Sequence, residues 1–97
     1  MFPKGYRIEN TKALEDCKLK PCLICGQKAD PHHIKSRGAG GNDVDWNLIP
    51  LCRFHHTEVH KIGLSLFQNK YYEIQQWLLN NGWTFDLGRQ KWTHDEN

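Results

Sequence analysis

Long apolar runs are missing from this 97-residue sequence. No stretch approaches the roughly 20 apolar residues that a membrane-crossing helix needs, and no charged-then-apolar signal segment opens the chain. Hydrophobic residues make up 38% of the chain and the mean hydropathy is −0.75, values typical of a soluble domain. We therefore expect a cytoplasmic protein with no membrane partner, in a compartment where cysteines stay reduced.

A strong excess of either charge is also missing. The formal net charge is +2, which is too small to indicate a nucleic-acid partner by itself. Its distribution is uneven: residues 1–37 carry eight Lys/Arg against four Asp/Glu, whereas residues 38–97 carry five against seven. A basic half of this kind can meet phosphates, but ordinary solvated lysines explain the count equally well.

The chain is too short for a large core. A protein of this length buries about two-thirds of the surface that its unfolded chain exposes, so a structural metal would add useful stability. We expect a single α+β domain over residues 1–97. Its core is expected over residues 22–62, followed by a helix and a hairpin within residues 65–94.

Metal-binding side chains are abundant in a short stretch. Residues 22–60 hold three of the four cysteines and five of the six histidines. Cys22 and Cys25 form a C-x2-C pair that can bind one ion, and Cys52 and His55 repeat the same gap. This pattern predicts a tetrahedral Cys3His zinc site; the alternative is a set of buried cysteines without metal.

Cys17 lies outside this pattern. We expect it on a helix over residues 11–18 that is capped by Asn10 or Thr11, after an extended arm over residues 1–10. Because Cys17 has no C-x2-C partner, we interpret it as a small buried hydrophobic residue. A role as a further zinc ligand is the alternative.

Four more histidines lie within or directly after this zinc pattern. His56 and His60 are four residues apart on a helix expected over residues 53–61 and stopped by Gly63, so their imidazoles can share one ion. His32 and His33 lie on the strand of a hairpin expected over residues 29–34 and 44–51. An HxxxH pair can also be a solvated helical face, and the neighbouring histidines favour the metal interpretation.

The remaining segments show patterns typical of a loop, a helix and a hairpin that pack around the core. Residues 38–43 are glycine-rich and lack the spacing of a phosphate-binding loop, so we expect a flexible hairpin loop. Ser65 and Gln68 match a capping box for one long helix over residues 65–80. A terminal hairpin is expected over residues 83–94. Its aromatic residues either cover the core or stack on bases, and we expect His94 on the surface.

The histidines and Asn47 resemble the motif of the HNH endonuclease family, particularly its small phage and prophage members with a paired zinc knot. Asn47 follows His33 by fourteen residues, His56 follows Asn47 by nine, and His60 lies one helical turn further on. The resemblance implies a ββα-metal fold, in which a hairpin packs on a helix with a divalent ion between them. It covers residues 22–60.

The resemblance implies a role for each matching residue. His33 takes the position of the general base, and Asn47 that of the side chain that holds the hairpin. His32, His56 and His60 take metal-ligand positions. The family's usual fourth zinc cysteine is His55 here, and its frequent aspartate ligand is His32. An imidazole-rich site suits Mn, Ni, Co or Zn better than Mg.

DNA is the partner that this resemblance implies, and a phage terminase or another targeting protein is a second partner that the resemblance suggests. Lys35, Arg37 and Arg53 are candidates for neutralising phosphate charge. Three functions follow. The first is a metal-dependent endonuclease that nicks or cuts duplex DNA with little base readout. The second is a zinc-stabilised DNA-binding or packaging module that needs a partner for activity. The third is a zinc-ribbon scaffold, in which His33 would have no purpose.

Overall fold

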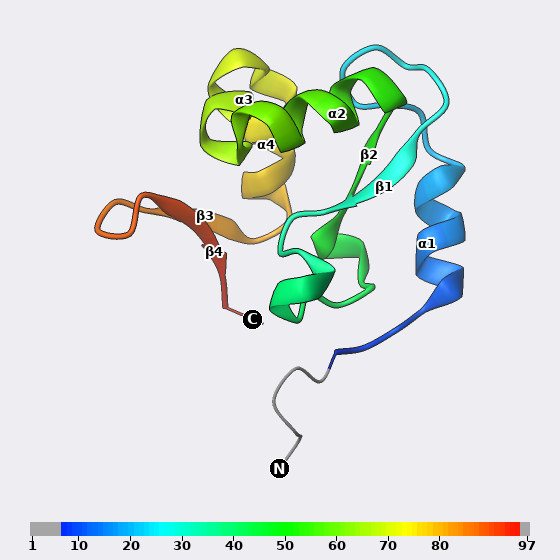
Figure 1. The fold of residues 1–97 in the computed structure, drawn as a ribbon, viewed down its shortest axis with the longest axis horizontal. Helices are drawn as coiled ribbons and strands as arrows, with labels where there is room; N and C mark the ends of the chain where they lie inside the picture. The colour runs from blue at the N-terminus through cyan, green and yellow to red at the C-terminus, as the bar shows by residue number, and fades with distance from the viewer. Residues whose placement is uncertain (1–6, 96–97) are drawn as a thin grey trace.

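Four α-helices and two small antiparallel sheets form the part of the chain that the computed structural model describes, residues 7–95 (Figure 1). The predicted α+β class is confirmed. The elements are α1 (Thr11–Lys18), β1 (Asp30–His33), β2 (Leu48–Leu51), α2 (Arg53–Ile62), α3 (Leu64–Lys70), α4 (Tyr72–Asn80), β3 (Trp83–Asp86) and β4 (Lys91–His94), with short 3-10 helices η1 (Arg37–Ala39) and η2 (Asp45–Asn47). None of the helices within residues 7–95 has the length and apolar character to span a bilayer.

The first helix has the predicted bounds. Its N-cap is Asn10, whose side chain accepts a hydrogen bond from the Ala13 N–H. Of the arm predicted over residues 1–10, residues 1–6 lie outside the described part. Residues 7–10 run beside residues 41–43, because the Ile8 N–H donates to Asn42 Oδ1 and the Asp43 N–H donates to the Ile8 carbonyl.

The first hairpin pairs β1 with β2, and His32 and His33 lie opposite Ile49 and Leu48. Its second strand is shorter than predicted. Residues 45–47 form η2, and the extended conformation begins only at Leu48. The side chain of Asn47 explains the difference: it is fully buried and bonds to backbone groups of Lys35 and Asn42, which requires the chain to turn there.

The glycine-rich loop of residues 38–43 is not the flexible connection that we expected. Ser36 caps the short helix η1 by accepting a hydrogen bond from the Ala39 N–H, and the Gly41 N–H donates to the Ser36 carbonyl. At Gly41 an added Cβ would lie 1.8 Å from the Lys35 carbonyl oxygen, so only glycine fits this close approach. The loop is therefore a packed part of the site.

Helix α2 confirms the expected helix after Cys52, extended by one residue to Ile62. It begins after Cys52 as the N-cap, and Gly63 ends it with φ +84°, a conformation that L side chains rarely adopt. In Figure 1 α2 runs across one end of the β1–β2 hairpin, with α1 on the other side of the hairpin. This arrangement brings residues from β1 and α2 together.

The single long helix predicted over residues 65–80 is wrong. Two helices occupy this segment, α3 and α4, because Tyr71 between them is extended, with φ −124° and ψ 106°. Ser65 is not a capping residue: the N-cap is Gly63, and Gln68 donates instead to the Ser65 carbonyl. The Tyr71 hydroxyl donates to Glu58 of α2 at 2.6 Å, so the residue at the break is bonded to the preceding helix.

The core lies between α2, the helix pair α3–α4 and the two hairpins. Phe67 of α3 and Ile74 and Leu78 of α4 are fully buried, so both helices contribute to the core despite the break at Tyr71. The terminal hairpin is confirmed as β3 and β4, with Phe85 opposite Trp92. His94, expected on the surface, is half-buried, and its ring stacks on Trp46 at 3.9 Å between centroids.

Candidate metal centres and active site

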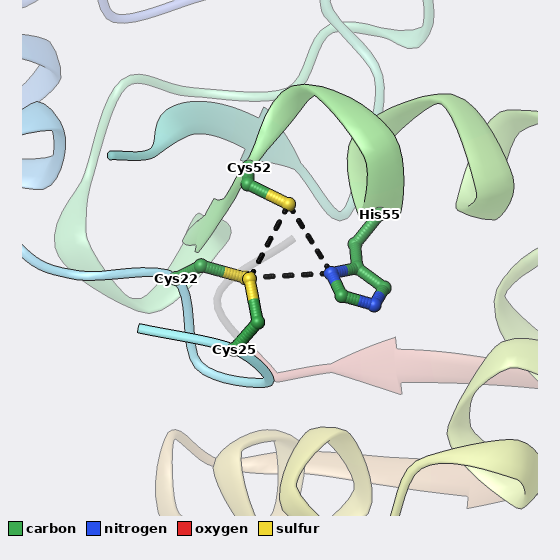
Figure 2. A group of neighbouring side chains, drawn as sticks. All are labelled: Cys22, Cys25, Cys52 and His55. Carbon is green, nitrogen blue, oxygen red and sulfur yellow. Dashed lines mark hydrogen bonds between the residues drawn. The ribbon is translucent and has the colours of Figure 1, made fainter. Parts of the chain in front are cut away.

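Three cysteines and one histidine meet at the start of α2. Figure 2 shows Cys22 and Cys25 reaching in from the turn before β1, toward Cys52 and His55. Cys25 Sγ lies 3.6 Å from Cys52 Sγ, and His55 Nδ1 lies 3.2 Å from Cys52 Sγ and 3.7 Å from Cys22 Sγ. Tetrahedral bonds of about 2.3 Å from zinc to sulfur place two sulfurs about 3.8 Å apart. The cluster can therefore hold a metal ion such as zinc.

The backbone prepares Cys22 to bind a cation. Burial raises the pKa of this thiol, but the backbone N–H groups of Cys52, Cys25 and Ile24 point at its sulfur and bring the pKa down to about 6. A thiolate is the form that ligates metal. Gly26, at φ +77°, closes the turn with a hydrogen bond from its N–H to the Cys22 carbonyl. The local geometry therefore fits a metal-bound thiolate.

Cys17 does not belong to this cluster. It is buried on α1, and burial raises the pKa of its thiol to about 11, against a small opposing effect of Lys20. A thiol with this pKa stays protonated at neutral pH, and a protonated thiol is a poor ligand. The interpretation of Cys17 as a buried hydrophobic residue agrees with this environment.

A second cluster consists of His32 from β1 and of His56 and His60 from α2. One ring nitrogen of each histidine lies within 4.8 Å of the others. The ring centroid of His32 lies 5.0 Å from that of His56 and 4.9 Å from that of His60. The ring centroids of His56 and His60 are 4.9 Å apart. The helical spacing of four residues places His56 and His60 one turn apart, opposite the strand residue.

The surroundings keep two of these histidines neutral. Burial, together with the neighbouring His56, His60 and His33, lowers the pKa of His32 to about 3. Burial and His60 also lower the pKa of His56. Neutral imidazoles have a lone pair for a metal ion, and three of them facing one another cannot all be protonated. The donor set therefore fits a divalent ion that accepts nitrogen ligands.

His33 lies beside this cluster but bonds elsewhere. Its Nε2 lies 2.7 Å from Asp43 Oδ1, and its side chain is 11% exposed. Asp43 is almost fully buried. Burial raises the pKa of its carboxyl, but hydrogen bonds from His33 and from the Asn10 N–H, together with the Arg7 guanidinium, outweigh burial and lower the pKa. An ionised carboxylate only accepts, so Nε2 of His33 carries the proton and Nδ1 keeps its lone pair.

Asp43 and Arg7 were missed by the sequence analysis. Arg7 forms an ion pair with Asp43 and donates from Nε to the Gly41 carbonyl at 2.7 Å. Asp43 stands in a glycine-rich loop where an acidic residue suggests a solvated turn. No local pattern signals a contact with a histidine ten residues earlier. Only the fixed path of the loop, which residues 7–10 and Asn47 hold, brings the two side chains together.

Asn47 fixes the chain directly after the two histidines. Its Oδ1 accepts from the Lys35 N–H at 2.8 Å, and its Nδ2 donates to the carbonyls of Lys35 and Asn42 at 3.2 and 2.9 Å. The backbone carbonyl of Asn47 accepts from the Ile34 N–H. Strand β1 therefore ends at His33, and this allows His32 and His33 to line the same cavity despite being neighbours on a strand.

The cavity above the histidines has a volume of about 430 Å³. Its walls include all of His32, His33, His56 and His60, together with Lys18 and Arg37, and no carboxylate is among its lining residues within residues 7–95. The three residues predicted to contact DNA are separated. Arg37 lines this cavity, Lys35 lines a neighbouring one, and Arg53 is 87% exposed and pairs with Asp30 at 3.4 Å.

Two known proteins show sequence similarity to this chain. One is "Uncharacterized protein YdfU" of Escherichia coli (strain K12), 40% identical over 74 residues, which cover 72% of this chain and 21% of that protein. The other is "Probable deoxyribonuclease RhsB" of Dickeya dadantii (strain 3937), 37% identical over 46 residues, which cover 47% of this chain and 3% of that protein. The chain thus spans about a fifth or less of either relative. No solved structure matches it.

A protein-family model matches residues 1–84, which include both clusters and the cavity between α1 and α2. That family is described as "Protein of unknown function (DUF968)". Because the match covers most of the chain, this protein belongs to the DUF968 family.

Proposed function

We propose that this protein is a metal-dependent endonuclease of the HNH type, which hydrolyses phosphodiester bonds of DNA at the histidine cavity. The observation that carries the proposal is the pairing of two roles in one cavity. Three histidines can hold an ion there, and a fourth, His33, is held by a carboxylate beside them. The printed name of the Dickeya dadantii relative, a probable deoxyribonuclease, supports the same class of chemistry.

The two clusters divide the metal binding between them in this proposal. Cys22, Cys25, Cys52 and His55 hold a structural zinc ion, which ties the turn before β1 to the start of α2. His32, His56 and His60 hold a divalent ion such as Mn, Ni, Co, Zn or Mg, with the nitrogen ligands favouring the first four. When bound, that ion neutralises phosphate charge and acts as a Lewis acid. The β1–β2 hairpin and α2 then correspond to a ββα-metal core.

His33 serves as the general base. Its Nε2–H donates to Asp43, so Nδ1 is the atom that accepts a proton from the attacking water. The imidazole that results is positively charged, and the neighbouring carboxylate stabilises it. The side chain of Asn47 bonds to the backbone of Lys35 and so holds the chain in the bend that ends β1 at His33. The absence of carboxylates among the described residues of the cavity wall favours an anionic substrate.

DNA is the partner in this proposal, and Lys35, Arg37 and Arg53 are its candidate contacts. Arg37 is the best placed of them for the phosphate being cut, because it is exposed and lines the cavity with His33. Such contacts position the duplex without reading its sequence. We therefore propose low intrinsic sequence specificity. Both known relatives are bacterial proteins, and the proposed setting is the cytoplasm of a bacterium or of a phage-infected host.

A second candidate function is a zinc-stabilised DNA-binding or packaging module whose activity requires a partner, such as a terminase. It is favoured because the chain matches only a small part of each relative, 21% of one and 3% of the other, so most of each relative lies outside the match. Targeting or activation could reside in such additional parts. In this case the chain binds DNA but does not cut it alone.

The test is cleavage of supercoiled plasmid by the wild-type protein and by His33→Ala and His33→Asn, each stripped of loosely bound metal and then supplied with Mg, Mn, Ni or Zn. We expect nicking by wild type and a loss of about 10²- to 10⁴-fold in both variants, the range for a general base. Thermal melts of the variants should match wild type. Equal cleavage by all three proteins would refute His33 as the base, and tight binding without cleavage would favour the second function.

A further inference from the structure

A second cavity lies beside the histidine cavity and takes no part in the chemistry proposed above. It has a volume of about 570 Å³ and is bounded by the segment after β1, by the start of α3 and by the terminal hairpin β3–β4. Ser36 lines both cavities, and Lys35, in the wall of the second, follows His33 by only two residues. A chain-like substrate that passes the histidines can therefore continue into this space.

The charge of this cavity has one sign. Its lining includes Lys35, Arg89 and Lys91, and no carboxylate is among its lining residues in the described part of the chain. Lys35 and Lys91 form no ion pair with residues 7–95, and Arg89 has only a long contact of 3.8 Å to Asp86. In a protein of net charge +2, three cations around one cavity are a local concentration of charge that suits a phosphodiester backbone.

The wall also carries aromatic surface with an unused donor. Trp83 and Trp92 line the cavity. The Trp92 indole Nε1–H is buried and has no hydrogen-bond partner among residues 7–95, whereas Trp83 donates to the Trp46 carbonyl at 2.6 Å. That donor has no surface accessible to a ligand, so what the wall offers is the partly exposed ring of Trp92. A base or sugar of a nucleic-acid strand can pack on such an aromatic surface.

We propose that this cavity binds the phosphodiester backbone of the DNA strand directly beside the phosphate that is cut, with Arg89 and Lys91 of the terminal hairpin as its phosphate contacts. The proposal rests on the proposed function, because it takes the histidine cavity as the point of cleavage. It assigns the terminal hairpin, which lies outside the HNH-like segment of residues 22–60, to substrate binding.

The test measures equilibrium binding of a fluorescent duplex by anisotropy over a range of salt concentrations, with the full chain carrying His33→Ala so that no cleavage occurs. The test variant adds Arg89→Gln and Lys91→Gln. The control adds Lys12→Gln and Lys28→Gln, which remove the same charge from exposed positions outside both cavities. We expect the hairpin variant to bind about 10-fold or more weakly and its salt slope to fall by about 2, one for each phosphate contact.

The outcomes separate this inference from the proposed function. An equal loss in the test and control variants would mean general charge attraction and would overturn the inference. Unchanged binding in the hairpin variant, alongside cleavage by the wild type, would overturn it while leaving the nuclease intact. A loss confined to the hairpin variant supports backbone binding at this cavity; if the wild type never cleaves, the placement beside a cut phosphate is overturned together with the proposed function. If inorganic phosphate or an acidic peptide competes as well as duplex at equal charge, the site is a general anion site and the inference fails.

Discussion

The two candidate metal centres share helix α2 but differ in how the chain builds them. The Cys3His cluster has four ligand atoms, with contacts of 3.2 to 3.7 Å between them, and backbone N–H groups that favour a thiolate at Cys22. The histidine cluster has three ligand nitrogens on three rings, whose centroids are about 5 Å apart. It borders an open cavity of about 430 Å³, and an additional histidine stands beside it.

This difference separates a structural site from a reactive one. A structural site uses all of its ligand positions on the protein, so that the ion joins segments and adds directly to folding energy. A reactive site leaves positions open to a substrate and needs a base nearby. Each cluster takes a ligand from helix α2: the Cys3His cluster takes His55 near its beginning, and the histidine cluster takes His60 near its end. One helix therefore connects the stabilising centre to the reactive one.

The largest expected effect is in the Cys3His cluster. We expect Cys22→Ser to unfold the domain at ordinary temperature, because zinc binding supplies about 10–16 kcal/mol in small zinc domains and total stability is about 5–15 kcal/mol. The matched control is Cys17→Ser, which alters a buried cysteine that is no ligand. Circular dichroism melts and metal content per chain check both variants. A native-like melt of Cys22→Ser, with unchanged metal content, would contradict a structural role for this cluster.

A smaller effect is expected at the carboxylate beside His33. In Asp43→Asn the side chain keeps its shape but loses the charge that favours a protonated imidazole, so we expect kcat for plasmid cleavage to fall about 10- to 100-fold. KM should stay nearly constant, because Asp43 is only 1% exposed and so out of reach of bound DNA. The control is Asp45→Asn, two residues on, where the carboxylate is exposed. A loss expressed in KM, or an equal loss in the control, would show that Asp43 does not position His33.

Most of the residues in both clusters were predictable because metal ligands follow short-range spacing rules. A gap of two residues placed Cys22 with Cys25, and a gap of four placed His56 with His60; both pairs come together as local geometry requires. Helix α1, with Asn10 as its cap, was predictable for the same reason. Whether these clusters hold the proposed ions remains a prediction.

The remainder depended on contacts between distant segments. The sequence around Tyr71 favours one continuous helix, but Tyr71 is extended, and its hydroxyl bonds to Glu58, thirteen residues away. His94 reads as a surface residue, and its position depends on Trp46 in a different element. Asp43 is the most important omission, because its partners Arg7 and His33 lie 36 and 10 residues away in sequence. The periodic spacing of apolar residues that marks strands and helices does not report contacts between residues so far apart in sequence.

The most gradual effect concerns pH and His32. Its pKa falls from 6.5 in the unfolded chain to about 3 in the fold, because the side chain is buried among other histidines. Between these values the unfolded chain binds a proton that the folded chain does not. Stability is therefore fully present above pH 6.5 and is lost as the pH falls, by about 1.4 kcal/mol for each pH unit.

Urea unfolding at several pH values between 7.5 and 4.5 measures this slope, with the protein stripped of loosely bound metal so that the histidine cluster is empty and the structural zinc stays bound. His32→Gln provides the comparison. Other groups, the zinc thiolates among them, also titrate in this range, so the difference between the two slopes isolates His32. We expect the variant to lose less stability on acidification than the wild type. Parallel slopes would mean that His32 titrates normally and is not held neutral. In that case the contrast between the two centres would rest on geometry alone, because the histidine cluster would lose its prepared lone pair while the thiolate at Cys22 would keep its own support.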